Sequence, residues 1–115
     1  MNITQKENRI YFKEGDISYG NITINDSLVK IELIRVNEKY RGKGLAAKLL
    51  KKMIQYIQKH FHHVKIVLSP MPIGFGGPKE SKLNLEQLIK FYKSHKFKES
   101  NLKTREEPYL MERQI

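Results

Sequence analysis

The segment YRGKGLA, residues 40–46, lies between a strand-like run of aliphatic residues, 28–36, and a run with helical periodicity, 45–61. Amides in the first turn of a helix have no partner within the helix, and they point outward with the positive end of the helix dipole. Gly42 and Gly44 allow a positive φ and a close approach to the backbone, while Arg41 and Lys43 add positive charge. This order of elements predicts an anion site that suits a phosphate.

The glycine spacing excludes two familiar phosphate motifs. The P-loop needs a longer spacing and a Lys-Ser/Thr pair, and the dinucleotide fingerprint needs a third glycine. From the local residues alone, a solvated turn that leads into a helix is an equally good interpretation.

The bulk composition bounds the class of protein. A chain of 115 residues predicts a single domain, 1–115. It contains no cysteine, so a disulfide and a cysteine-based zinc site are excluded. The polar N-terminal segment lacks an apolar signal region, and no apolar run reaches the roughly 20 residues of a membrane span. We therefore expect a soluble cytoplasmic protein without a membrane partner.

The net charge of +10 is distributed unevenly. Residues 1–40 contain six basic and six acidic residues, whereas residues 41–115 contain sixteen and six, so the whole excess follows the glycine turn. A polyanionic ligand or a nucleic acid fits this distribution, although most lysines on helix faces only aid solubility. The scattered Tyr11, Tyr19 and Tyr40 do not form a base-stacking platform, which argues against a nucleic-acid partner.

Periodicity and turn residues predict an α/β fold. Strands are expected over 10–13, 17–24, 28–36 and 64–68, helices over 45–61 and 83–95, and closing strands over 97–99 and 109–111. The strands 17–24 and 28–36 should form a hairpin, and 28–36 should pair in parallel with 64–68 by a right-handed crossover. Residues 70–78 read as a proline- and glycine-rich loop, and its segment 73–78, which contains Phe75, is predicted to act as a flap.

Two segments resemble one known family. Residues 36–50, VNEKYRGKGLAAKLL, resemble the acetyl-CoA signature Gln/Arg-x-x-Gly-x-Gly/Ala of the GCN5-related N-acetyltransferase (GNAT) superfamily, which Arg41, Gly44 and Ala46 satisfy. Residues 91–97, FYKSHKF, resemble its Tyr-x-x-x-Gly-Phe segment. The resemblance covers residues 28–111 and implies a mixed, mostly antiparallel sheet with two main helices and a strand–turn–helix acetyl-CoA site.

The resemblance implies an acetyl-CoA-dependent N-acetyltransferase without a metal. A primary amine of the acceptor would attack the thioester directly in a ternary complex. The backbone near the end of the central strand would bind the pantetheine and thioester, through Ile34, Arg35 and Val36. The glycine turn would hold the pyrophosphate, through Arg41, Gly42, Lys43, Gly44, Leu45 and Ala46. A family asparagine that binds the coenzyme aligns with Leu85, so the neighbouring Asn84 has only a weak claim to that role.

The resemblance also implies two catalytic residues. Tyr92 matches the tyrosine that protonates the departing thiolate, although a helix tyrosine with a buried ring would fit the same pattern. Glu32 is the candidate general base, with an ordered water as the alternative. A strand glutamate paired with Lys30 explains the same residue without catalysis.

Besides the position of Leu85, the chain departs from the family in two places. His95 and Lys96 replace the usual residue and glycine before Phe97. Two helices that normally separate the first two strands have no room between Lys13 and Ile17, so one acceptor wall is missing. The alternative function is therefore a non-catalytic CoA-binding, or basic nucleic-acid- or protein-binding, module on a degenerate GNAT fold.

The sequence does not decide whether the amine acceptor is a protein, a peptide or a small molecule. A homodimer could supply the missing wall. His60, His62 and His63 gather at a helix end, where we expect a structural or surface role.

Overall fold

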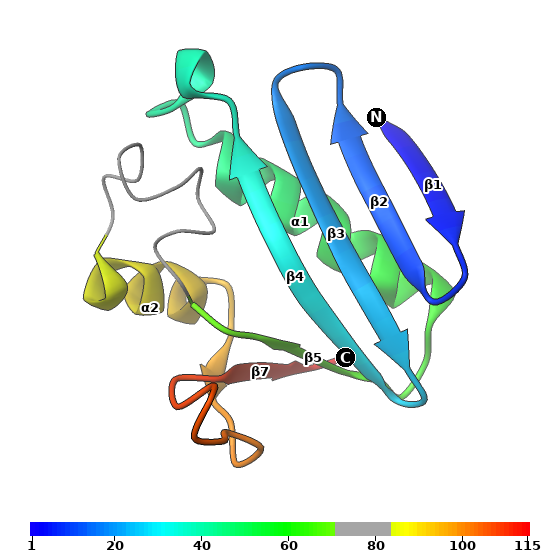
Figure 1. Ribbon diagram of the computed structural model, residues 1–115, viewed down its shortest axis with the longest axis vertical. Coiled ribbons are helices and arrows are strands. Elements are labelled where there is room, and N and C mark those ends of the chain that lie inside the picture. Colours follow the sequence, from blue (N-terminus) through cyan, green and yellow to red (C-terminus); the bar gives the residue numbers. More distant parts are fainter. Residues whose placement is uncertain (71–83) are drawn as a thin grey trace.

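The computed structural model describes residues 1–70 and 84–115. These residues form a seven-stranded sheet and three helices. The strand order is β1-β2-β3-β4-β5-β7-β6, and every neighbouring pair is antiparallel except β4 and β5. The strands are β1 (Asn2–Lys6), β2 (Arg9–Glu14), β3 (Ser18–Asn25), β4 (Leu28–Val36), β5 (Lys65–Leu68), β6 (Lys98–Glu99) and β7 (Met111–Gln114). The helices are the 3₁₀ helix η1 (Glu38–Tyr40), α1 (Leu45–His60) and α2 (Leu85–Ser94). Figure 1 shows α1 behind the strands β2–β4.

Both α-helices pack against one face of the sheet. The apolar stripe of α1 is buried and consists of Leu49, Leu50, Met53, Ile54 and Ile57. Leu88 and Tyr92 of α2 belong to the same apolar core. Arg113 of β7 donates a hydrogen bond to the His95 carbonyl at 2.9 Å, which ties the end of α2 to this face. Among the described residues, no helix covers the opposite face, where Tyr11, Tyr19 and Leu33 lie.

The structure confirms most predicted elements. The strand 28–36 has the predicted bounds, and its parallel pairing with the next strand is present. The two helices end within one residue of the predicted positions. The closing hairpin forms as β6 and β7, although β7 begins later than expected. The loop 70–78, apart from its first residue, lies outside the described residues, as does the flap proposed at 73–78 with Phe75.

The position of the missing helices was predicted wrongly. Strand β1 was not predicted, because its polar sequence NITQK is exposed along its whole length and shows no alternation. It pairs with β2, and only Glu7 and Asn8 connect the two strands. The first strand of the sheet is therefore present. The short connection that stands in place of the two family helices is Glu7 and Asn8, and not the segment between Lys13 and Ile17.

Strand β4 contains a β-bulge at Glu32. Asn21 of β3 lies opposite Leu33, whereas the next residue, Ile22, lies opposite Ile31, so Glu32 is an extra residue in β4. The buried positions of β4 accordingly change from odd to even numbers, Val29 and Ile31 followed by Ile34 and Val36. A bulge bends its strand and increases the local twist.

The strands β4 and β5 diverge just beyond this bulge (Figure 1). Their ladder joins residues 28–31 to 65–68, and among the described residues it ends with the pair Ile31 and Leu68. Strand β4 continues to Val36. The last residues of β4 therefore lie beyond the described ladder to β5, and we call the region where the two strands diverge the opening.

The end of α2 closes without a glycine. The amide of Phe97 donates to the Tyr92 carbonyl at 3.1 Å, and the amide of Lys96 donates to the Lys93 carbonyl at 3.0 Å. This pair of bonds is the Schellman motif, which needs a left-handed residue where glycine is favoured. Lys96 occupies that position with φ of 70°.

We predict that Lys96→Gly stabilises the protein by about 1 kcal/mol, because a left-handed conformation is unfavourable for a side-chain-bearing residue. The melting temperature should rise by a few degrees, which calorimetry measures. Lys90→Gly, within the right-handed part of α2, is the matched control and should destabilise by about 1 kcal/mol. A Lys96→Gly variant that melts at or below the wild-type temperature would contradict the expectation.

Candidate cofactor and active site

The glycine turn is fastened to the end of β4. Asn37 caps η1 by accepting a hydrogen bond from the Lys39 amide at 3.3 Å. Its own amide donates to the Ile17 carbonyl at 2.8 Å, and its side-chain nitrogen donates to the Asp16 carbonyl at 3.0 Å. The Arg41 Nε donates to the Val36 carbonyl at 2.9 Å. Part of the Arg41 side chain therefore positions the turn.

The start of α1 has the features of an anion site. Gly44 is the N-cap residue with φ of 72°, and Gly42 has φ of 80°. Among residues 1–70 and 84–115 no side chain caps α1, and the first turn of α1 contains no acidic residue. A glycine cap leaves the first amides accessible to an anion at the positive end of the helix dipole. The Lys43 Nζ lies 5.9 Å from the centre of the Tyr40 ring, next to this site.

The residues predicted to bind pantetheine lie at the open end of β4. Ile34 and Val36 are buried on the helix-covered face, so their side chains pack in the core and only their backbone is available to a ligand. Arg35 lies on the opposite face, across from Tyr19. The bond between Arg41 and Val36 brings this segment and the glycine turn together, as the sequence predicted.

Tyr92 lies in the core beneath α2. Tyr92 is 5% exposed. Its ring contacts the rings of Phe91 and Phe97 edge-on, at centroid distances of 5.2 and 5.9 Å. Burial raises the pKa of the Tyr92 phenol well above its ordinary value. The phenol is therefore protonated throughout the physiological range, as a proton donor must be.

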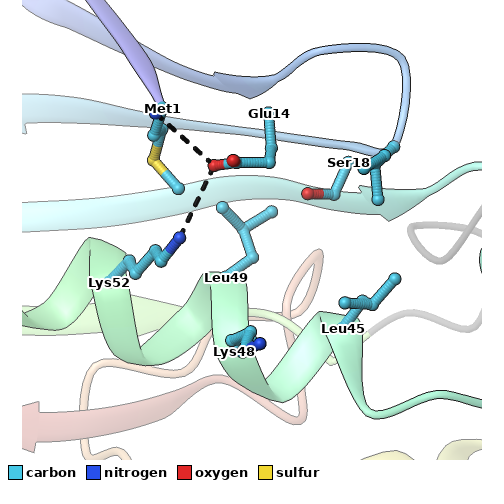
Figure 2. Close-up of a pocket in the computed structure, with 8 residues that line it drawn as sticks. Met1, Glu14, Ser18, Leu45, Lys48, Leu49 and Lys52 are labelled. Carbon is cyan, nitrogen blue, oxygen red and sulfur yellow. Dashed lines mark ion pairs between the residues drawn. The ribbon is translucent and has the colours of Figure 1, made fainter.

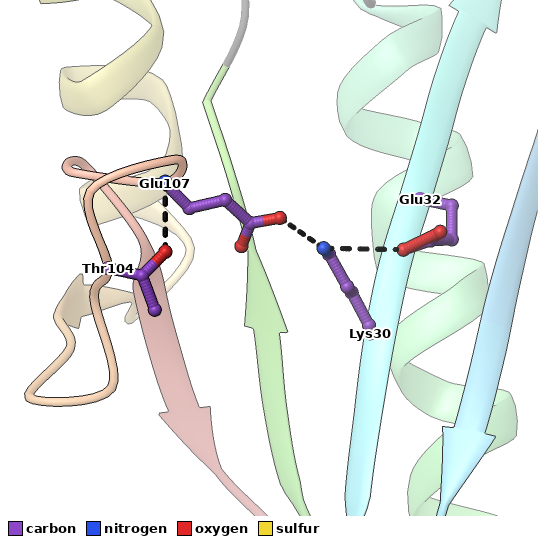
Figure 3. A network of polar contacts seen from close by, with 4 residues as sticks. All are labelled: Lys30, Glu32, Thr104 and Glu107. Carbon is purple, nitrogen blue, oxygen red and sulfur yellow. Dashed lines mark hydrogen bonds and ion pairs between the residues drawn. The ribbon is translucent and has the colours of Figure 1, made fainter.

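Glu32 lies in the bulge with its side chain 30% exposed. The Lys30 Nζ lies 3.7 Å from the Glu32 Oε1, so the pairing considered as an alternative from the sequence is present. Lys30 also forms a hydrogen bond and ion pair with Glu107 (Figure 3). The role of Glu32 as a base stays a prediction.

Asn84 is the N-cap residue of α2. It forms a capping box with Gln87: its side chain accepts from the Gln87 amide at 2.8 Å, and its amide donates to the Gln87 side chain at 3.0 Å. The spacing of the two residues in NLEQ was a recognisable signal for this cap. The proposed coenzyme contact of Asn84 stays a prediction, and the structure gives its side-chain oxygen a helix-capping role.

Comparison with known families decides the class of protein. The acetyltransferase (GNAT) family model matches residues 6–71, more than half of the chain. The chain belongs to the GNAT family. The match begins well before residue 28, where the sequence resemblance was expected to start, and it includes the whole of β2.

A solved structure has the same fold. The crystal structure of the anti-CRISPR protein AcrVA5 superposes with a TM-score of 0.68 at 19% sequence identity, over 91% of this chain and 97% of that chain. Comparison with curated protein sequences gives no match. GNAT proteins use acetyl-CoA, and membership of the family makes this chain an acyltransferase.

Two cavities flank the GNAT site. One, of about 510 Å³, lies at the end of β4 on the helix-free face, where Tyr19, Leu33 and Arg35 line it together with the β2–β3 loop. The other, of about 190 Å³, lies between that loop and the first turns of α1 (Figure 2). There the Glu14 Oε2 lies 3.5 Å from the Lys52 Nζ. Neither was predicted, because each is formed by elements far apart in the sequence.

The described residues include no group of three His, Asp or Glu side chains that could hold a metal ion. His60 packs against the Tyr56 ring at 4.2 Å, and His62 and His63 are exposed. In the same part of the chain, neither α-helix is long and apolar enough to cross a membrane.

We predict that Gly44→Ala destabilises the protein by about 1–2 kcal/mol. An added Cβ would meet nothing within 4 Å, so the cost comes from the left-handed backbone and not from a clash. Urea unfolding measures it. Gly44→Asn is the matched variant and should lose less, because asparagine tolerates this conformation. Equal stability of the alanine variant and the wild type would show that the turn does not need this conformation.

Proposed function

We propose that the protein is an acetyl-CoA-dependent N-acetyltransferase that acts on a primary amine. The observation that carries this proposal is the glycine turn at the start of α1, fastened by Arg41 to the end of β4 beside the opening toward β5. A phosphate-binding turn and the part of β4 beyond its ladder to β5 then lie next to each other. An extended ligand with a phosphate at one end, such as acetyl-CoA, suits that arrangement.

The cofactor would lie with its pyrophosphate on residues 41–46. The pantetheine would pass along the backbone of Ile34, Arg35 and Val36, as an added strand would. The opening ends at the bulge, which suits the thioester end of the chain. Because these contacts come from the backbone, they do not demand particular side chains.

The reaction forms a carbon–nitrogen bond and breaks the carbon–sulfur bond of the thioester. The neutral amine attacks the carbonyl carbon, and its surplus proton passes to Glu32 directly or through a water. The thiolate leaves and takes a proton from the Tyr92 phenol, which is protonated at neutral pH. Alignment of the amine and the thioester supplies a large part of the rate enhancement.

The helix-free face favours a polypeptide acceptor. Where longer GNAT proteins have two helices, Glu7 and Asn8 alone connect β1 and β2. An extended segment could therefore lie over β3 and β4 with its amine at the opening. The cavity of about 510 Å³ at the end of β4 would receive a neighbouring side chain of that segment.

We predict that acetyl-CoA raises the melting temperature by several degrees, since ligand at 100 times its dissociation constant adds about 2.7 kcal/mol of stability. Differential scanning fluorimetry with acetyl-CoA, CoA and 3′-dephospho-CoA measures the shift. Lys43→Ala should weaken binding about two- to fivefold, because its ammonium lies near the anion site. Lys59→Ala, at the far end of α1, is the control. Absence of a shift with all three ligands would refute the proposal.

We predict that Tyr92→Phe lowers kcat about 100-fold while leaving the acetyl-CoA dissociation constant unchanged, because only the proton donor is removed. Thiol release with a lysine-rich peptide measures kcat. Tyr56→Phe on α1 is the matched control, because that ring packs against Phe12 at 5.3 Å in the core. Unchanged kcat in the Tyr92 variant would show that the thiolate leaves without this phenol.

A non-catalytic CoA-binding protein is the second candidate, and the ion pair between Lys30 and Glu32 favours it, because a paired carboxylate has a structural explanation. A thermal shift with acetyl-CoA and no thiol release with any tested amine would support this candidate.

A further inference from the structure

Three charged side chains meet at the base of the opening between β4 and β5 (Figure 3). Lys30 belongs to β4, Glu32 to its bulge, and Glu107 to the loop between β6 and β7, 77 positions from Lys30. The three side chains are 33%, 30% and 30% exposed. Lys30 lies opposite Val67, one position before the ladder between the two strands ends. The cluster therefore lies where a ligand between the strands would stop.

Hydrogen bonds within the loop fix the backbone of Glu107. Its amide donates to the Thr104 Oγ1 at 3.1 Å, and its carbonyl accepts from the Thr104 amide at 3.2 Å. The Leu110 amide donates to the same carbonyl at 3.4 Å. Figure 3 shows the Glu107 side chain reaching over β5 toward Lys30. The ammonium of Lys30 is thus held from a second element.

The two carboxylates contact Lys30 unequally. Glu107 accepts a hydrogen bond from the Lys30 ammonium, whereas the Glu32 Oε1 lies 3.7 Å away, beyond hydrogen-bond range. Glu32 therefore lies beside the Lys30 ammonium but does not accept a hydrogen bond from it. Its oxygens remain available to a water or an amine.

We propose that Lys30 is a positioning residue for Glu32. Anchored by Glu107, it holds the Glu32 carboxylate at the base of the opening, where the attacking amine would arrive. In the transfer step, the proton that leaves the attacking amine passes to Glu32, directly or through one water. This inference rests on the proposed acetyl transfer for what Glu32 does.

Among the described residues, the ion pair of Glu32 is the one with Lys30. Lys65 of β5 pairs with Glu112 of β7 at 3.2 Å. The residues of β3 nearest the bulge on this face, Asn21 and Thr23, are uncharged.

The test measures kcat and KM with acetyl-CoA and a lysine-rich peptide as substrates. In Lys30→Met we expect kcat to fall about tenfold with the acetyl-CoA KM unchanged, because the Glu32 carboxylate is no longer held at the base of the opening. Lys30→Arg should restore most of kcat. Lys65→Met, which removes a lysine of the neighbouring strand β5, should leave kcat unchanged.

A second comparison separates positioning from a general structural effect. In a Glu32→Gln background, Lys30→Met should cause no further loss, because its effect passes through Glu32. Equal losses in both backgrounds, or an unchanged kcat in Lys30→Met, would overturn the inference. The acetyl-CoA thermal shift shows whether each variant is folded. No transfer by the wild type would instead refute the proposed function itself.

Discussion

One extra residue in the central strand organises the candidate site. The first half of β4 is paired on both sides, which keeps its backbone satisfied and its odd-numbered residues in the core. Beyond Glu32 the side chains change face and the ladder to β5 ends. A parallel pair that stayed closed would leave no strand edge for a ligand. The bulge thus coincides with the end of the described ladder to β5, and the proposed cofactor would lie along the strand beyond it.

The two faces of the sheet have different roles. The helix-covered face holds the apolar core and the start of α1, where the positive end of the helix dipole adds to the charges of Arg41 and Lys43. On the other face lie Tyr11, Tyr19 and Arg35, and the Glu107 side chain reaches over β5 (Figure 3). A cofactor bound from one face and an acceptor from the other would meet at the opening.

Much of the fold was predictable because its signals are local. The helix stripe of α1, the strand 28–36 and the glycine turn each depend on neighbouring residues. Strand β1 escaped prediction since an exposed edge strand has no apolar alternation. The bulge left a sign in the sequence, since the apolar residues at 29, 31, 34 and 36 break a period of two. The contact between Lys30 and Glu107 left none, because it joins distant segments whose placement only the tertiary fold decides.

Gly20 gives the packing of α1 a consequence for ligand binding. An added Cβ there would lie 2.7 Å from the Met53 sulfur, so the missing side chain determines how closely the helix approaches β3. Residues 41–44 lead directly into that helix, while Arg41 ties them to β4. A larger residue at position 20 would therefore move the start of α1 relative to the end of β4. Core volume and the geometry of the proposed anion site are consequently coupled in this chain.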